Sequence, residues 1–582
     1  MESDRQEVNA EVIAVYPDRV RISVDDLASF KHAEESLRVG SYLKISDNEN
    51  ISLICIIESF LIEVKEVVDS SPKRKYIIEA YPLGTLADGE FKRGGDELAI
   101  PPKKVVPATS AEVGAIYTSA FEEGKRFCFS SLTRQRSISV PVHGDRFFNK
   151  HIAIVGATGS GKSHSVATIL QEVVTAKKSD YQGLNNSHIV IFDIHSEYHK
   201  AFPDANVLGV DELLLPYWLL NEEEMEEIFL ESGDRNNYNQ ESLLRTIVTL
   251  CKRNKNAGAS KVYFDSPLKY EIKELVNCLI NLTRETKDTD DPFHIVTASN
   301  EFNFSDEEDK LSHYCAELLN FAPGQRASKD KIGINKGSYA DGSIDKFVRR
   351  LASKINNPRL NFLFGPKASA LSLDEVLQQL TGYVADSNTN ITILDLSGIP
   401  FEVLSITVSL ITRLIFDYGY YFRRSQAKCD TPILLVYEEA HKYAPKSGLS
   451  RYKSSLSAIE RIAKEGRKYG VSLLIASQRP SEISETIFSQ CSNFLAMRLT
   501  NPDDQAYVRR LLPDTLGNIT TGLPSLEAGE ALLIGDATVM PCVVYVSPCN
   551  PEPSSNDIPY LELWKEEWKT VDFGIIGDEW KK

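Results

Sequence analysis

The sequence predicts an α/β fold: a parallel sheet covered by helices, preceded by a small all-β domain and interrupted by a helical insertion. Three observations support this prediction. Short alternating or apolar runs separated by turn signals fill residues 8–107, a spacing typical of a small barrel or sandwich. From residue 131 onward, strand-like runs alternate with helical ones, which favours a parallel sheet with covered faces. About 200 residues separate the second and third of these strands, far more than one crossover needs.

The domain boundaries follow from these changes of pattern. We expect a β-barrel with a connecting helix over residues 1–130 and the α/β core over 131–548, with the insertion at about 213–385. The acidic, tryptophan-containing tail, 549–582, is a candidate for docking on a neighbour. The candidate core strands are 151–155, 188–193, 391–396, 433–437, 471–477 and 494–499. In the insertion, helices are expected at 221–229, 241–251, 268–284, 306–319 and 344–355, and mobile loops at 284–291 and 324–342.

Composition limits the function classes. The 582 residues carry 65 Lys and Arg against 82 Asp and Glu, a net charge of −17, so any contact with nucleic acid must be local. The nine cysteines are scattered, without the spacing of a metal site, and we expect reduced thiols. The sequence contains neither a run of about 18 apolar residues nor a signal-like N-terminus. We therefore expect a cytoplasmic protein without a membrane partner.

A complete phosphate loop follows the first core strand directly. Residues 156–163 read GATGSGKS, in which small residues let backbone N–H groups converge on a phosphate, Lys162 reaches the β- and γ-phosphates, and Ser163 offers its hydroxyl to Mg²⁺. The helix that begins there adds its positive N-terminal dipole. A strand before and a helix after the loop are the context that the motif requires. The expected nucleotide-binding residues are Gly156, Ala157, Thr158, Gly159, Ser160, Gly161, Lys162, Ser163 and His164.

A second motif places two carboxylates at the end of a buried strand. Residues 433–441 read ILLVYEEAH, and ligands bind at the carboxyl ends of strands in open α/β sheets. We assign Glu438 to holding Mg²⁺ and Glu439 to polarising the attacking water as a base. The alternative is a solvated helix N-terminus, where acidic residues are also favoured.

A third motif, residues 191–198 with the sequence IFDIHSEY, follows the second core strand. Asp193 and Glu197 are candidates to face the metal or the water, with Asp193 the possible metal ligand of the two. The alternative is capping and turn chemistry. His195 lies beside these carboxylates, as His441 lies beside Glu439, and both fit hydrogen-bonding orienters better than ligands.

The segment after the acidic strand offers a sensor and a set of cations. Gln478 ends the strand 471–477 and is our candidate for sensing the γ-phosphate. Upstream, Arg461, Lys464, Arg467 and Lys468 are spaced three or four apart, so they share one side of a helix. These cations form either a solvated basic face or a charge supplied to a neighbour's transferring phosphate.

Five motifs, in this order, resemble those of the HerA family of hexameric P-loop ATPases, DNA translocases related to the FtsK motors. They are GATGSGKS at 156–163, DIHSEY at 193–198, EEAH at 438–441, EGRKYG at 465–470 and SQRP at 477–480. The closing segment 523–531, LPSLEAGEA, is also similar. The resemblance covers about residues 8–546 and is weakest over 213–385.

The resemblance implies a RecA-like P-loop NTPase core and an N-terminal barrel of the kind shared with rotary ATP synthases. It also implies a six-membered ring around duplex DNA, with ATP between subunits and an arginine finger from the neighbour. By motif position Arg467 is the first candidate for that finger and Arg461 the second. This sequence departs from the family at Glu438, where an aspartate is usual. The extra methylene is expected to move the Mg²⁺ shell and slow turnover.

Two functions compete. The first is an ATP hydrolase that drives translocation along double-stranded DNA, or its unwinding, and serves a partner nuclease or other effector in DNA end processing or antiviral defence. The alternative is an ATP-binding hexameric scaffold that assembles an effector, such as a nuclease or a sirtuin-like enzyme. A metabolic kinase or GTPase is disfavoured by the double-glutamate strand. The candidate DNA contacts are either Arg326, Lys329, Lys331 and Lys336 or Lys446, Arg451 and Lys453.

Overall fold

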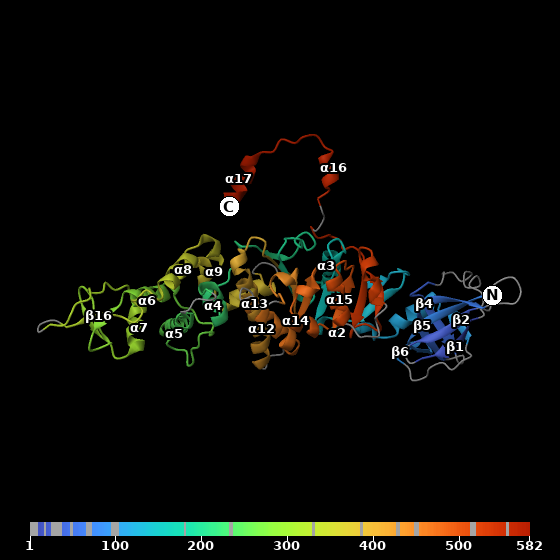
Figure 1. Ribbon diagram of the computed structural model, residues 1–582, viewed down its shortest axis with the longest axis horizontal. Coiled ribbons are helices and arrows are strands. Elements are labelled where there is room, and N and C mark those ends of the chain that lie inside the picture. Colours follow the sequence, from blue (N-terminus) through green and yellow to red (C-terminus); the bar gives the residue numbers. More distant parts are fainter. Residues whose placement is uncertain are drawn as a thin grey trace.

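The structure is a computed structural model, and three sheets organise it (Figure 1). The N-terminal sheet lies at one end of an elongated molecule, the largest sheet at its centre and the helical insertion at the other end. The C-terminal tail leaves the body as a separate arm. The residues described are 10–16, 19–24, 38–46, 51–65, 73–94, 104–179, 182–231, 237–328, 332–384, 388–425, 431–446, 453–511, 519–554 and 558–581.

The N-terminal sheet is antiparallel and curls back on itself. Its strands run in the order β2-β1-β7-β3-β4-β5-β6, and β2 also pairs with β5, from Val20 opposite Ala80 to Val24 opposite Tyr76. The predicted barrel is confirmed in part, because within the described residues β1 and β7 are paired only at Glu11 and Lys104. The strands are β1 Ala10–Val15, β2 Val20–Val24, β3 Tyr42–Ser46, β4 Ile51–Lys65, β5 Lys73–Ala87, β6 Glu90–Arg93 and β7 Lys104–Pro107.

The central sheet confirms the mixed α/β prediction. Its order is β12-β17-β11-β18-β19-β10-β20-β21-β22-β8-β9, parallel from β12 to β20 and antiparallel beyond. The six predicted core strands are all present and adjacent. Its strands are β8 Arg126–Leu132, β9 Ser139–His143, β10 Ile152–Val155, β11 His188–Asp193, β12 Asn206–Leu208, β17 Ile391–Asp395, β18 Ile433–Tyr437, β19 Val471–Ser477, β20 Asn493–Met497, β21 Glu530–Gly535 and β22 Cys542–Tyr545.

Both faces of this sheet are buried. In β10, Ala153 and Val155 belong to one hydrophobic cluster, while Ile152 and Ile154 belong to the other, because successive side chains point to opposite faces of a sheet. The first cluster continues into the insertion. The helices of the core and its connector are α1 Ser110–Thr118, α2 Gly144–Asn149, α3 Lys162–Thr175, α12 Phe401–Arg424, α13 Lys453–Glu465, α14 Glu485–Gln490 and α15 Pro502–Leu511, and those of the tail are α16 Tyr560–Trp564 and α17 Phe573–Lys581.

The insertion is helical, as expected, but it also contains a small antiparallel sheet of order β15-β14-β13-β16. The prediction of mobile loops at 284–291 and 324–342 is therefore wrong where β13 pairs with β16. Three-residue strands show no periodicity that a sequence pattern could display. The insertion contains α4 Glu222–Phe229, α5 Asn237–Lys255, α6 Ile272–Arg284, β13 Thr286–Asp288, β14 His294–Val296, β15 Glu301–Asn303, α7 Glu307–Ala316, β16 Ile334–Lys336, α8 Asp345–Ile355, α9 Asn361–Phe364, α10 Pro366–Ala370 and α11 Leu373–Thr381.

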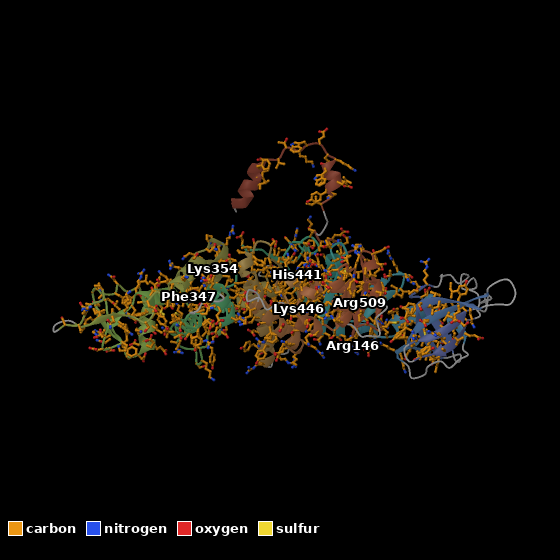
Figure 2. All side chains as sticks on the ribbon, in the orientation of Figure 1. Arg146, Phe347, Lys354, His441, Lys446 and Arg509 are labelled. Carbon is orange, nitrogen blue, oxygen red and sulfur yellow. The ribbon has the colours of Figure 1, made fainter. Side chains whose placement is uncertain are left out.

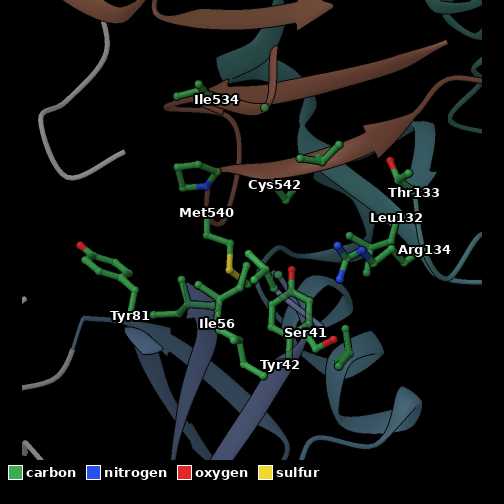
Figure 3. A pocket seen from close by; sticks show the side chains of 18 of the residues that line it. Ser41, Tyr42, Ile56, Tyr81, Leu132, Thr133, Arg134, Ile534, Met540 and Cys542 are labelled. Carbon is green, nitrogen blue, oxygen red and sulfur yellow. The ribbon is translucent and has the colours of Figure 1, made fainter. Parts of the chain in front are cut away.

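A cavity of about 1560 Å³ separates the N-terminal sheet from the core. Figure 3 shows Tyr42, Ile56 and Tyr81 of the N-terminal sheet facing Met540 and Cys542 of the core. The hydroxyls of Tyr42 and Tyr117 are hydrogen-bonded at 2.9 Å and tie the N-terminal sheet to α1. The eight cysteines in the described part of the chain are free thiols. Within the same residues, no helix is both long and apolar enough to cross a membrane.

Candidate active site

The phosphate loop links the end of β10 to the start of α3 and depends on its glycines. Gly159 and Gly161 have φ angles of 71° and 93°, a left-handed region that other L-residues rarely adopt. A Cβ on Gly156 would lie 2.5 Å from Ser160 Oγ. The three glycines of GATGSGKS are therefore required by the shape of this loop.

Two distant segments support the loop from behind. The Ala157 N–H donates to the Arg498 carbonyl at 2.8 Å, and Arg498 Nη2 donates back to the Gly159 carbonyl at 3.2 Å. From the 523–531 segment, the Gly529 N–H donates to the Ser160 carbonyl at 3.0 Å. Sequence reasoning missed Arg498, which falls inside the predicted strand 494–499 but directly follows the observed β20.

Lys162 joins the loop to the acidic strand. Its Nζ lies 2.5 Å from Glu439 Oε1 and 2.9 Å from Glu438 Oε1, and its side chain is 5% exposed. Burial lowers the pKa of Lys162, but the two carboxylates outweigh that effect and raise it. The lysine is thus a buried, charged group held by two carboxylates.

Gln478 connects Glu439 to the phosphate loop. Because β19 lies between β10 and β18, the residue after β19 lies between both motifs. Gln478 Nε2 donates to Glu439 Oε1 at 2.7 Å, and the Thr158 hydroxyl donates to Gln478 Oε1 at 2.7 Å. A movement of Thr158 in the phosphate loop would therefore be passed to Glu439 through the side chain of Gln478.

Glu439 is held in an unusual backbone conformation, with φ 48° and ψ 45°, which is strained for a residue with a Cβ. His441 Nδ1 lies 3.2 Å from Glu439 Oε2. Burial raises the pKa of Glu439, but His441 and Lys162 outweigh it and lower that pKa to about 2. Figure 2 locates His441 in the centre of the molecule, between the two ends.

Glu438 is more deeply enclosed. Its Oε2 accepts a hydrogen bond from the Tyr198 hydroxyl at 2.9 Å, and its backbone carbonyl accepts one from the Tyr443 hydroxyl. Burial raises the pKa of Glu438, and Lys162 opposes that rise. One oxygen of the carboxylate thus contacts Tyr198, and the other contacts Lys162.

The DIHSEY motif reaches the site through its tyrosine. Asp193 accepts the backbone N–H groups of His195 at 3.2 Å and Tyr198 at 2.9 Å, which is the geometry of the capping alternative. The Glu197 carbonyl accepts the N–H of Ser554 at 2.7 Å. The carboxylate of Asp193 thus organises a turn, and Tyr198 is the residue of this motif that contacts Glu438.

The two candidate finger residues differ in their surroundings. Arg461 stacks over the Phe416 ring at 4.2 Å and lies 3.8 Å from Asp417 Oδ1, so it has partners in its own subunit. Arg467 is exposed on a short turn before β19. Since β19 spans seven residues, roughly 20 Å at ~3.3 Å per residue, Arg467 lies at the opposite edge of the sheet from the phosphate loop.

The candidate DNA contacts are dispersed. Lys446 Nζ donates to Glu485 at 2.6 Å, and Lys453 lies 3.5 Å from Glu223, while Arg326 and Lys336 are exposed in the insertion. Figure 2 labels Lys446 in the central part of the molecule. Three further candidates lie outside the described residues: Lys329, Lys331 and Arg451.

The donors at this site suit ATP and a hard divalent cation. Mg²⁺ prefers oxygen ligands and is held in proteins by one or two carboxylates and by substrate phosphates. The residues that could hold such a cation are Glu438, which follows β18 and carries a carboxylate, and Ser163, which lies in the first turn of α3 and carries a hydroxyl. Both residues are oxygen donors, so they fit the Mg²⁺ ion that a phosphate loop implies.

Comparison with known proteins places these motifs in context. The family model for the central domain of the helicase HerA matches residues 127–415. A probable helicase of Methanocaldococcus jannaschii is 24% identical over 92% of this chain and 91% of its own length. The DNA double-strand break repair helicase HerA of Saccharolobus solfataricus is 25% identical over 82% of this chain and 81% of its own length. A solved structure, VirB4 of Thermoanaerobacter pseudethanolicus, is similar with a TM-score of 0.44 and 13% identity, over 76% of this chain and 98% of that one.

Proposed function

Because this chain belongs to the HerA family of P-loop ATPases, we propose that it uses ATP hydrolysis to translocate along double-stranded DNA or to unwind it. The observation that carries the proposal is the convergence of buried Lys162 and Glu439 with half-buried Gln478 in one cluster. Three similar proteins are named DNA double-strand break repair helicase HerA, which supports the proposal.

The geometry supports a sequence of steps at this cluster. ATP binding draws Lys162 away from the glutamates toward the β- and γ-phosphates. Glu439 then loses a cation 2.5 Å away, so its pKa rises and it becomes a better acceptor for the proton of the attacking water. Mg²⁺, held by Ser163 and Glu438, supplies positive charge against the phosphates when bound. Gln478 links the phosphate loop to Glu439 and senses the γ-phosphate.

The test uses the rate of ATP hydrolysis with and without duplex DNA. Lys162→Ala and Glu439→Gln should each abolish DNA-stimulated turnover, by at least about 100-fold if each removes several kcal/mol of transition-state stabilisation. Glu482→Gln is the matched control, since Glu482 is an exposed partner of Arg479 and its variant should hydrolyse ATP normally. Turnover unaffected by the first two substitutions would refute the assignment.

We further propose that the working form is a six-membered ring, with Arg467 completing the site of the next subunit. Arg467 is exposed at the far edge of the sheet, where it cannot serve its own phosphate loop. The candidate partners in such a ring are double-stranded DNA and an effector, either a nuclease or a sirtuin-like enzyme, in DNA end processing or antiviral defence.

A second candidate function is a ring that serves as a scaffold for an effector. The C-terminal tail favours it, because this tail has the side chains to hold such a ring together. The arm carries large exposed apolar side chains: Trp564 at 76%, Trp568 at 98% and Phe573 at 76% exposed. Such residues are costly to leave in water unless a partner covers them. We propose that this arm docks on a neighbouring subunit and stabilises the ring.

Truncation after Ser554 tests this role and retains the hydrogen bond from Ser554 to Glu197. Light scattering should show smaller assemblies for the truncated protein, while Glu439→Gln should assemble normally. Unchanged assembly size after truncation would exclude the tail from ring formation. If a co-purified effector remained active on the Glu439→Gln ring but not with the truncated protein, the scaffold function would be favoured.

A further inference from the structure

The carboxylate of Glu438 has two side-chain contacts, and in the proposed mechanism ATP binding removes one of them. Lys162 Nζ holds Oε1 at 2.9 Å, and the Tyr198 hydroxyl holds Oε2 at 2.9 Å. Once Lys162 moves to a phosphate, Tyr198 is the side chain of this pair that still orients Glu438. Tyr198 is fully buried, so water does not compete with it.

The position of Tyr198 is set by three neighbouring segments. Asp193, at the end of β11, accepts the Tyr198 N–H at 2.9 Å. Ser196 has a left-handed φ of 56°, and its hydroxyl donates to Asp395 Oδ2, at the end of β17, at 2.8 Å. The Ser554 N–H donates to the Glu197 carbonyl. The turn is thus fixed to both strands and to the C-terminal segment, which leaves its tyrosine little freedom to move.

We propose that Tyr198 is a positioning residue that adapts this site to a glutamate at the metal-holding position. The inference rests on the proposed Mg²⁺-dependent hydrolysis of ATP. Glutamate has one more rotatable bond than aspartate, so its carboxylate can turn away from the phosphates unless it is restrained. The Tyr198 hydroxyl restrains Oε2 and leaves Oε1 directed at the place that Lys162 occupies in this structure.

The chain offers a matched control in Tyr437, the residue before Glu438. Tyr437 is also fully buried, and its hydroxyl is hydrogen-bonded to Thr412 Oγ1 of α12 at 2.7 Å. Tyr198→Phe and Tyr437→Phe therefore each remove one buried hydroxyl, but the first alone removes a contact to the Glu438 carboxylate. Thermal unfolding should show similar losses of stability for both.

The decisive measurement is the binding of a fluorescent, non-hydrolysable ATP analogue with and without Mg²⁺. For Tyr198→Phe we expect the gain in affinity from Mg²⁺ to fall about tenfold, the effect of losing one hydrogen bond to a charged group, while affinity without Mg²⁺ stays unchanged. Tyr437→Phe should retain the full gain. In steady-state hydrolysis, Tyr198→Phe should also raise the Mg²⁺ concentration required for half-maximal rate.

Glu438→Asp provides an independent variant, because its shorter side chain is withdrawn from Tyr198. In this variant, adding Tyr198→Phe should cost little further Mg²⁺-dependent gain, since the contact that Tyr198→Phe removes is already broken. A normal Mg²⁺ gain in Tyr198→Phe would overturn the inference while leaving the proposed function intact. Failure of the unmodified protein to hydrolyse ATP would instead refute the proposed function.

Discussion

At the scale of single residues, the site contains groups whose charge depends on their neighbours. Lys162 and Glu439 stabilise each other's charged forms, and both are almost fully buried. If one partner of such a buried ion pair moves away, the charge left behind is costly unless a ligand compensates the partner that moved. The cluster therefore favours a site that rearranges when a phosphate arrives.

His151 makes a pH-dependent contribution to stability. It is buried, its Nδ1 accepts the Leu473 N–H at 3.1 Å, and its Nε2 donates to the Ala463 carbonyl at 3.1 Å. Burial lowers its pKa from 6.5 to about 4, against the Ala463 hydrogen bond and with help from Arg467. Because this pKa is lower in the folded state, the contribution to stability is complete above pH 6.5 and is lost as the pH falls to about 4.

We therefore predict that the free energy of unfolding declines over that pH window, by roughly 3 kcal/mol as an upper limit from this group. His151→Asn, which tolerates the left-handed φ of 55° at this position, should flatten the decline. Denaturant titrations at pH 4 to 7 measure it, with the exposed His199→Asn as control. An unchanged pH profile in His151→Asn would disprove the assignment.

At the scale of elements, the phosphate loop depends on a segment that follows it by more than 350 residues. Gly529, with φ 82°, supports the Ser160 carbonyl through its N–H. A Cβ there would lie 3.0 Å from the Val546 carbonyl oxygen. The strand order brings the segment around Gly529 against the phosphate loop. A residue outside the GATGSGKS motif therefore helps to hold the loop in its conformation.

Gly529→Ala should therefore destabilise the protein by about 1–2 kcal/mol and weaken nucleotide binding. Gly522→Ala is the matched control, because a Cβ on Gly522 meets open space. Thermal unfolding and titration with a fluorescent ATP analogue measure both effects. Equal behaviour of the two variants would show that the loop does not need this support.

Most elements of the core could be predicted from the sequence, because apolar runs of five or more residues bounded by turn signals are distinctive. Others could not. The three-residue strands β13 and β16 lie in segments predicted to be loops, and their pairing depends on residues about 50 positions apart. In the DIHSEY motif, the predicted site residues are the carboxylates Asp193 and Glu197, whereas Tyr198 makes the contact to Glu438. Residue type alone did not indicate which side chain points at the site.

At the scale of the whole molecule, the nucleotide site and the candidate finger lie at opposite edges of the sheet. If Arg467 serves the next subunit, replacing it should inactivate the nucleotide site of that neighbouring subunit. We predict that Arg467→Ala lowers DNA-stimulated ATP hydrolysis by about 10³-fold, the scale of an arginine finger, while Arg461→Ala lowers it much less because Arg461 has partners in its own subunit.

Mixing experiments distinguish a finger from a local role. In mixed rings, Arg467→Ala subunits should restore partial activity to Lys162→Ala subunits, because each variant lacks a different half of a shared site. Hydrolysis measured across mixing ratios would show this rescue as activity above that of either variant alone. Activity no higher than either variant alone at every ratio would contradict action across an interface.

The sequence by itself determined the phosphate loop, the acidic strand and the order of the family motifs, because each is a short pattern that carries its chemistry locally. Only the tertiary structure decided how they meet. The placement of β19 between β10 and β18 brings Gln478 between Thr158 and Glu439, and the turn after β11 brings Tyr198 to Glu438. These contacts join residues 39 to 320 positions apart, and strand order, which sets such contacts, is a property of the packed sheet rather than of any single segment.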